Sequence, residues 1–317
     1  MAKVYALFIM NKDGIPLFSR NLAPEKIQPD LIASFLTAIG SFVKEISPIG
    51  GPALRCIEAE GFTILIETGQ KVYGALIVDH RSLIAEEYIR ALVREFEELY
   101  GQKLEAWDND TSVFQPFGEV CDRVMSVIAV SSFHIPRLGH VELGKDVTIP
   151  RELWAVLRFV DGRRTVAEIA SEAGLSVDEA VQRIEKLMEM GLVDVDISEP
   201  VRKVAKAYEE ALNEYLEELR DLLGRELVEA ALSRAVASWG QPWLGSSEGG
   251  GLVEVKEADR LAWLHTPGEA SEMFKSFFSK LGQEVRPLLG VLASDIMARV
   301  QMDMRSKHEE EFKKFGA

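Results

Sequence analysis

The sequence has few cysteines and no long apolar run. Its 317 residues include only two cysteines, Cys56 and Cys121, and neither belongs to a CxxC pair. This spacing argues against a disulfide framework or a cysteine zinc site and favours buried thiols in a reducing compartment. No window holds ~20 consecutive apolar residues, so we expect no transmembrane helix. Charges interrupt the short apolar run at the start, which is unlike a signal peptide, and we expect a cytoplasmic protein.

Basic residues are also in deficit. Lys and Arg number 36 against 51 Asp and Glu, which gives a formal net charge of −15. Such a charge argues against a general affinity for nucleic acids or anionic membranes. The apolar fraction of 47% is ample for hydrophobic cores, and the length predicts two or three domains.

Motifs for catalysis and cofactor binding are missing as well. The sequence GGP at residues 50–52 lacks the Lys-Ser/Thr of a phosphate-binding loop. His80 follows a predicted strand, but no acid or nucleophile stands at motif spacing from it. His134 and His140 are neighbours, whereas metal sites usually need three or four clustered ligands. We therefore expect no catalytic residue, no cofactor and no metal site.

The clearest local signals lie in residues 161–195. Thr165 with Glu168 three residues later forms a capping box, and Ser176 with Glu179 forms a second one. A glycine at position 174 separates them, and residues 192–195 alternate like a strand. Two capped helices joined by a glycine-containing turn predict a helix-turn-helix, with a first helix at 150–160 and the strand as the start of a wing.

This stretch resembles a known family. The sequence RTVAEIA, followed by GLSVDEAVQRIEKLMEMGLV, is similar to winged-helix folds of the PqqD-like type and of many archaeal and bacterial regulators. The resemblance covers about residues 147–197. It implies a fold and leaves the use of that fold open, because one fold serves many functions.

DNA binding is the obvious function of such a segment. The recognition helix would be 176–190, which carries four acidic and two basic residues, whereas DNA binding depends on Lys and Arg. The candidate contacts are Gln182, Arg183 and Lys186 on that helix, and Arg163 and Arg164 before the preceding one. The acidic balance favours a protein-contact or spacer role.

Residues 1–126 show the pattern of an α+β domain. Strands are predicted at 3–11, 15–20, 53–60, 62–67 and 71–79, and helices at 31–46, 83–100 and 114–125. Five strands with helices against one face predict an antiparallel sheet layer.

This order, with YALFIMNKDGIPLFSR opening the chain and EFEELYGQKLEAWDND ending the second helix, resembles the longin domain over about residues 3–125. The related roadblock domain begins with a helix, which is missing here. Longin-like domains occur in vesicle-trafficking proteins, in tethering and exchange-factor complexes and in archaeal proteins. The resemblance implies a docking platform for a small Ras-like GTPase or for another longin or roadblock domain.

The first strand suggests where a partner binds. Tyr5, Leu7, Ile9 and Met10 place apolar groups on both of its faces, whereas a wetted face would be polar. We expect the second face to be covered by a partner, by a second copy or by the C-terminal helices, and to be a protein interface.

The last third is helical. Helices are predicted at 199–222, 226–239, from Thr266 onwards and at 286–312, around a flexible loop at 240–251, and together they predict a helical bundle. Its Phe and Met stripe fits core packing, a ligand pocket or a groove for a partner helix, of which core packing is the commonest. Trp239 and Trp243 flank the glycine loop as an exposed contact site.

Four segments result: a longin-like domain at 1–126, a connector at 127–146, a winged helix at 147–198 and a helical domain at 199–317. We expect a non-enzymatic adaptor or scaffold that binds a small GTPase or another longin or roadblock protein, with homo-oligomerisation left open and nucleic acid not expected. The alternative is a transcription regulator whose longin-like domain senses a ligand or dimerises. An enzyme is a third reading, disfavoured by the missing motifs.

Overall fold

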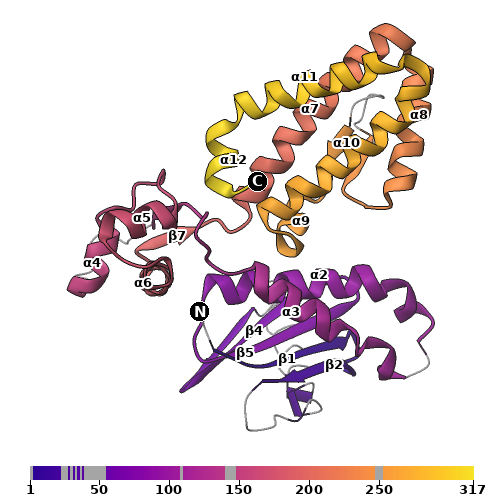
Figure 1. Ribbon diagram of the computed structural model, residues 1–317. Coiled ribbons are helices and arrows are strands. Elements are labelled where there is room, and N and C mark those ends of the chain that lie inside the picture. The colour runs from indigo at the N-terminus through magenta and orange to yellow at the C-terminus, as the bar shows by residue number, and fades with distance from the viewer. Residues whose placement is uncertain are drawn as a thin grey trace, which may run out of the picture. The chain divides into compact units, whose positions relative to one another are not determined.

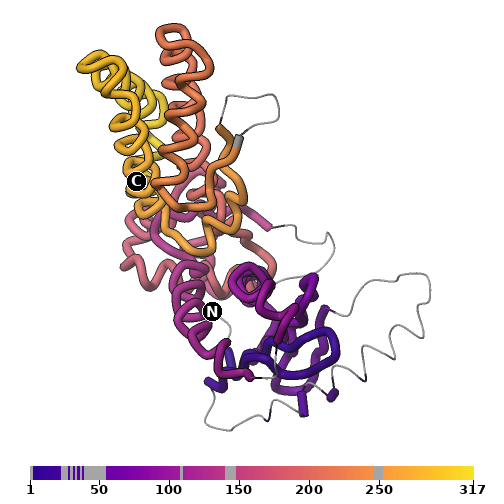
Figure 2. The backbone as a smooth tube through the Cα atoms, turned by 90° about the vertical axis from the view of Figure 1, so that its right-hand side faces the viewer, coloured from indigo at the N-terminus to yellow at the C-terminus, as the bar shows by residue number. Residues whose placement is uncertain are grey.

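The computed structural model describes residues 3–22, 28, 31–32, 34–35, 38, 55–107, 110–139, 148–246 and 253–317. The chain forms two compact units, one of Met1–Ala129 with Glu185–Gly191 and the other of Val130–Ile184 with Leu192–Ala317. The described fold is α+β, as predicted, with one five-stranded antiparallel sheet and a largely helical remainder (Figures 1 and 2).

The sheet belongs to the first unit. Its strands are β1 (Val4–Asn11), β2 (Pro16–Asn21), β3 (Cys56–Ala59), β4 (Phe62–Thr68) and β5 (Val72–Val78). They lie in the order β2-β1-β5-β4-β3, and each neighbouring pair is antiparallel. Runs such as VYALFIMN favour strands because β-branched and aromatic side chains pack well on a pleated surface. The five predicted strands are confirmed.

Helix α2 (Leu83–Glu105) covers one face of this sheet. Gly74 of β5 lies beneath it, and a Cβ atom at this position would overlap the side chains of Ile89 and Val93. Glycine therefore permits the close approach of helix and strand. The prediction that Gly101 ends this helix is wrong, because the backbone stays helical through Gly101 to Glu105.

A second helical layer follows α2. It consists of the 3₁₀ turn η1 (Thr111–Phe114) and helix α3 (Phe117–Val127). The ring of Phe117 meets Phe96 of α2 at 5.0 Å and Phe18 of β2 at 5.4 Å, both edge-on. Aromatic contacts of this kind stabilise beyond the area that they bury, so α3 is held against both α2 and the β2 side of the sheet.

The opposite face of the sheet has its own apolar cluster. Its buried members are Ala6, Phe8, Met10, Ile32, Ile64, Ala75 and Ile77. Ile32 does not come from a strand: residues 31, 32, 34, 35 and 38 are helical, and the rest of the helix predicted at 31–46 lies outside the described residues. Both faces of the sheet thus carry helical residues, whereas the sequence predicted helices against one face.

Three short helices follow in the middle of the chain: α4 (Arg151–Leu157), α5 (Val166–Ala173) and α6 (Val177–Glu189). Both capping boxes are confirmed. Thr165 Oγ1 accepts from the Glu168 N–H at 3.2 Å while the Glu168 carboxylate accepts from the Thr165 N–H at 2.7 Å. Ser176 and Glu179 exchange the same pair of bonds. Each box satisfies donors that a helix start leaves unpaired.

A two-stranded sheet closes this segment. Strand β7 (Val193–Val195) pairs antiparallel with β6 (Pro136–Leu138). The sequence suggested residues 141–143 as the partner of this strand, and these lie outside the described residues. The observed partner, β6, lies earlier in the predicted connector, where Pro136 pairs with Val195 and Leu138 with Val193.

The C-terminal helical region is built from helices α7 (Glu199–Leu223), α8 (Arg225–Trp239), α9 (Ala258–Leu264), α10 (Pro267–Leu289), α11 (Val291–Lys307) and α12 (Glu309–Phe315), with a hairpin of β8 (Leu244–Ser246) and β9 (Val253–Val255). The single helix predicted at 286–312 is wrong. Gly290, with a φ of 61°, ends α10, and His308 separates α11 from α12.

Aromatic side chains fill the core of this region. Phe274, Phe277 and Phe278 of α10 are completely buried. Tyr208 of α7 stacks on Phe274 at 5.4 Å, and its hydroxyl lies 2.9 Å from Ser271 Oγ. The Phe stripe of α10 is therefore core, which was the commonest of the three readings.

Candidate functional site

The apolar residues of β1 are buried rather than exposed. Leu7 and Ile9 are 1% and 0% exposed, and Ile9 pairs with Gly74 beneath α2, so both point to the α2 face. Met10 is 2% exposed and belongs to the opposite cluster with Ile32. Leu7, Ile9 and Met10 are therefore core residues of this chain and not an accessible interface, because alternate residues of a strand point to opposite faces and the residues on each face are buried.

Half-buried residues surround the cluster on the second face. Tyr5, Ile57, Ile66 and Tyr73 pack against it while keeping part of their surface exposed. Lys12 Nζ lies 3.9 Å from the centroid of the Tyr73 ring, a cation–π contact. Of the four predicted interface residues on β1, only Tyr5 is among these half-buried residues.

The outer edge of β3 has a defined hydrogen-bonding direction. Ile66 N–H donates to the Arg55 carbonyl at 2.8 Å, so residue 55 points its backbone groups at β4. Bonded and non-bonded positions alternate in an antiparallel pair. Ile57 and Ala59 therefore also face β4, and Cys56 and Glu58 direct their N–H and C=O groups outward. In the described part of the chain, no strand pairs with this outer edge.

At the other edge of the sheet, α3 packs beside β2 through side chains. Arg20 of β2 donates to the Gly118 carbonyl at 3.1 Å and forms an ion pair with Asp122 at 2.8 Å. Both partners belong to α3, which thereby lies along β2.

The tryptophan pair is not an exposed contact site. Trp239 and Trp243 are 8% and 3% exposed. The Trp239 ring packs on Phe277 at 4.9 Å, and the Trp243 ring lies under the guanidinium of Arg260 at 5.2 Å. Trp239 is buried because it ends the apolar face of α8, which packs on α10. The sequence suggested exposure because the two tryptophans adjoin a glycine-rich stretch, and the contact with α10 is made by residues that are distant in the chain.

The residues considered for DNA contact fall into two groups. Arg164 is tied to its own turn, since it pairs with Asp161 at 2.9 Å, and the Arg163 carbonyl accepts from Lys314 of α12 at 3.4 Å. On α6, Gln182 and Lys186 are exposed.

Arg183, the remaining candidate on α6, donates to the Glu152 carbonyl of α4 at 3.2 Å. Among the described residues, no hydrogen bond or ion pair joins the α6 candidates to Arg163 or Arg164. Arg164 and Arg183 are thus engaged in contacts of their own, whereas Gln182 and Lys186 are exposed.

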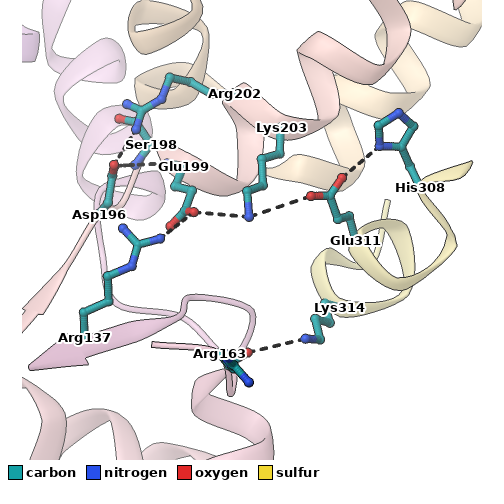
Figure 3. Close-up of polar contacts among 10 residues, drawn as sticks. All are labelled: Arg137, Arg163, Asp196, Ser198, Glu199, Arg202, Lys203, His308, Glu311 and Lys314. Atoms are coloured by element: carbon teal, nitrogen blue, oxygen red, sulfur yellow. Dashed lines mark hydrogen bonds and ion pairs between the residues drawn. The ribbon is translucent and has the colours of Figure 1, made fainter. Parts of the chain in front are cut away.

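A polar network surrounds the start of α7 (Figure 3). Glu199 accepts from Arg137 of β6 at 2.7 Å and pairs with Lys203 at 3.2 Å, and Lys203 also reaches Glu311 of α12 at 3.7 Å. Asp196 accepts from the Glu199 N–H at 3.1 Å and so caps α7. These bonds connect β6, α7 and α12 within the second unit.

His134 anchors the same junction from inside. Its side chain is 1% exposed; Nδ1 accepts from the Ser131 N–H at 2.8 Å, and Nε2 lies 3.1 Å from the Ile197 carbonyl. This places the proton on Nε2 in the neutral ring. Burial lowers the pKa of His134 to about 4. The carbonyl of His134 also accepts from the Val166 N–H at 2.9 Å, so the residue supports the start of α5.

The thiols are poor nucleophiles. Burial raises the pKa of Cys121 to about 12, and desolvation also raises the pKa of Cys56. The thiolate is the reactive form of cysteine, so both side chains remain protonated at neutral pH.

Among the described residues, no group of three or more His, Cys, Asp or Glu side chains could hold a metal ion. No helix in that part of the chain is long and apolar enough to cross a membrane. No known protein-family model matches the sequence, and no curated protein is similar to it.

Proposed function

We propose that this chain is a non-enzymatic adaptor whose sheet unit docks a partner protein. The partner we propose is a small Ras-like GTPase or another longin or roadblock domain, which follows from the resemblance of residues 3–125 to the longin domain. The middle segment, as a winged helix, and the C-terminal helices would serve as spacer and scaffold.

The outer edge of β3 carries this proposal. The sheet order β2-β1-β5-β4-β3 leaves β2 against α3, while Cys56 and Glu58 of β3 direct backbone donors and acceptors outward. An edge of this kind can accept a strand of another chain, because main-chain hydrogen bonds give affinity and neighbouring side chains give specificity. Phe62, which follows β3 in the hairpin and is 39% exposed, supplies an apolar group beside it.

The side-chain chemistry agrees with a binding role. Neither thiol is activated, and both ring nitrogens of the buried His134 are engaged in structural hydrogen bonds. Perturbed groups at catalytic sites are typically tuned towards the working pH. Here the pKa shifts of Cys121 and His134 lead away from it.

The test compares two substitutions at one position. Glu58→Pro removes the outward N–H of β3, whereas Glu58→Gln keeps it and removes only the charge. Each full-length variant is used to purify partners from the native cell extract, with identification by mass spectrometry. We expect wild type and Glu58→Gln to retain a GTPase or a longin or roadblock protein and Glu58→Pro to lose it.

Equal retention by all three proteins, each with unchanged thermal unfolding, would contradict docking at β3. Recovery of neither partner class by the wild type would contradict the adaptor assignment.

DNA binding by the middle segment is the second candidate. The observation in its favour is that α5 and α6 form a capped pair around a tight turn at Gly174, whose φ of 67° requires a left-handed backbone. Fluorescence anisotropy with genomic fragments at moderate salt tests it. Submicromolar, sequence-dependent binding that is lost in Gln182→Ala and Lys186→Ala would establish this function in place of the spacer role.

A further inference from the structure

One end of the C-terminal helical region carries exposed apolar side chains. Helices α7 and α8 meet there at Gly224, and α10 and α11 meet there at Gly290, as both views show (Figures 1 and 2). The exposed residues, which we call the bundle-end patch, are Leu222 (51% exposed), Leu227 (48%), Leu288 (43%), Val291 (72%) and Leu292 (47%).

Ion pairs and a hydrogen bond set the register of the helices at this end. Glu218 pairs with Arg299, and Glu210 pairs with Lys307 at 2.7 Å, which sets α7 and α11 antiparallel and brings Leu222 opposite Asp295, about one helical turn from Leu292. Arg234 pairs with Glu284 at 2.6 Å and Lys280 donates to the Ser238 carbonyl at 2.9 Å, which sets α8 and α10 antiparallel. The same register brings Leu227 to the turn between α10 and α11.

The neighbouring charges are of both signs. Arg286, Asp221 and Glu226 are exposed, and within the described residues none of the three has an ion pair. An anionic membrane or a nucleic acid would require a net positive patch. A second copy of the same surface instead offers acids to Arg286 and a cation to Asp221 and Glu226, which is the self-complementarity of a two-fold contact.

We propose that the bundle-end patch joins two copies of this chain in a two-fold dimer. Contiguous exposed apolar surface of this kind typically marks an interface. An end-on contact also suits a chain with a net charge of −15, because repulsion between surfaces farther apart than about 8–10 Å is screened at physiological salt. Helix ends offer less area than a standard interface, so the dimer is weak, with dissociation roughly in the micromolar range.

The experiment is sedimentation velocity on the full chain from roughly 1 to 200 µM. Val291→Glu is compared with Met302→Glu. Both residues are in α11 and both are 72% exposed, but Met302 lies about 16 Å further along the helix. We expect the wild type to dimerise, Val291→Glu to raise the midpoint at least about tenfold, and Met302→Glu to leave it unchanged.

A charge exchange tests the arrangement itself. Arg286→Glu and the double variant Asp221→Arg, Glu226→Arg should each self-associate more weakly, and a mixture of the two should form heterodimers that restore association. Leu292→Gln replaces Val291→Glu if the latter loses its helical circular dichroism.

Three outcomes would overturn the proposal. The first is a wild-type monomer over the whole concentration range. The second is an equal effect of Val291→Glu and Met302→Glu. The third is a monomer that binds phosphatidylcholine vesicles in a flotation assay and loses this binding in Val291→Glu, which would assign the patch to a lipid surface.

Discussion

Protonation of His134 should loosen the junction between α5, β7 and α7. The ring is neutral in the folded chain because burial disfavours a charge, and its Nδ1 accepts a hydrogen bond from the Ser131 N–H. A proton on Nδ1 would turn this atom into a donor that faces the Ser131 N–H, so the hydrogen bond between them would be lost. The folded chain therefore binds this proton more weakly than the unfolded chain does.

The direction and size of the change in folding stability with pH follow from the pKa values of His134 in the unfolded and the folded chain. Burial lowers the pKa of His134 from 6.5 to about 4, so its contribution to stability is complete above pH 6.5 and declines as the pH falls towards 4. The difference of 2.5 pH units corresponds to about 3 kcal/mol when the loss is complete. At pH 5, the same relation gives a loss of about 2 kcal/mol.

Two measurements check this prediction. Urea unfolding, followed by tryptophan fluorescence at pH 7.5 and pH 5, compares the wild type with His134→Gln, which cannot titrate. Carboxylates titrate in both proteins, so the wild type should lose about 2 kcal/mol more than the variant. A histidine-labelled NMR titration should find one ring with a pKa near 4. A His134 pKa near 6.5, or equal losses in both proteins, would refute the reasoning.

Three substitutions and one control test the packing and the capping, each by urea unfolding of the full chain. Gly74→Ala should destabilise the sheet unit by about 1–3 kcal/mol, because its Cβ overlaps Ile89 and Val93; wild-type stability would show that α2 shifts freely. Thr165→Ala should cost about 1 kcal/mol through the lost capping box of α5, and no change would mean that the cap is redundant. Trp239→Ala should cost about 3–5 kcal/mol, whereas Trp154→Ala, at a side chain that is 54% exposed, should stay within about 0.5 kcal/mol; similar losses would contradict the burial of Trp239.

Local signals in the sequence predicted local structure well. The starts of α5 and α6 could be located from Thr165 and Ser176 because a capping box is formed by residues three positions apart. The strands of the sheet could be located because their side chains are apolar and β-branched over a whole run. The order of the strands in the sheet, β2-β1-β5-β4-β3, was not predicted, because it depends on pairing between residues that are distant in the chain.

Contacts between distant residues could not be predicted in this way. The hairpin of β8 and β9 borders a glycine-rich stretch, and it is held by Asn213, which bonds the N–H of Val253 at 2.8 Å and its carbonyl at 2.9 Å from 40 positions away. His134 resembled a connector residue because its partner, Ile197, is 63 positions further on. The outward direction of Glu58 required the register of β3 against β4.

Hydrogen–deuterium exchange on the purified complex with its partner tests the docking claim most directly. The amides of Cys56 and Glu58 have no partner strand in the described sheet, so they should exchange fast in the isolated chain and slowly in the complex. The account predicts that this protection centres on β3 and is absent with Glu58→Pro. Saturating partner that leaves β3 exchange unchanged while another surface becomes protected would contradict docking at this edge.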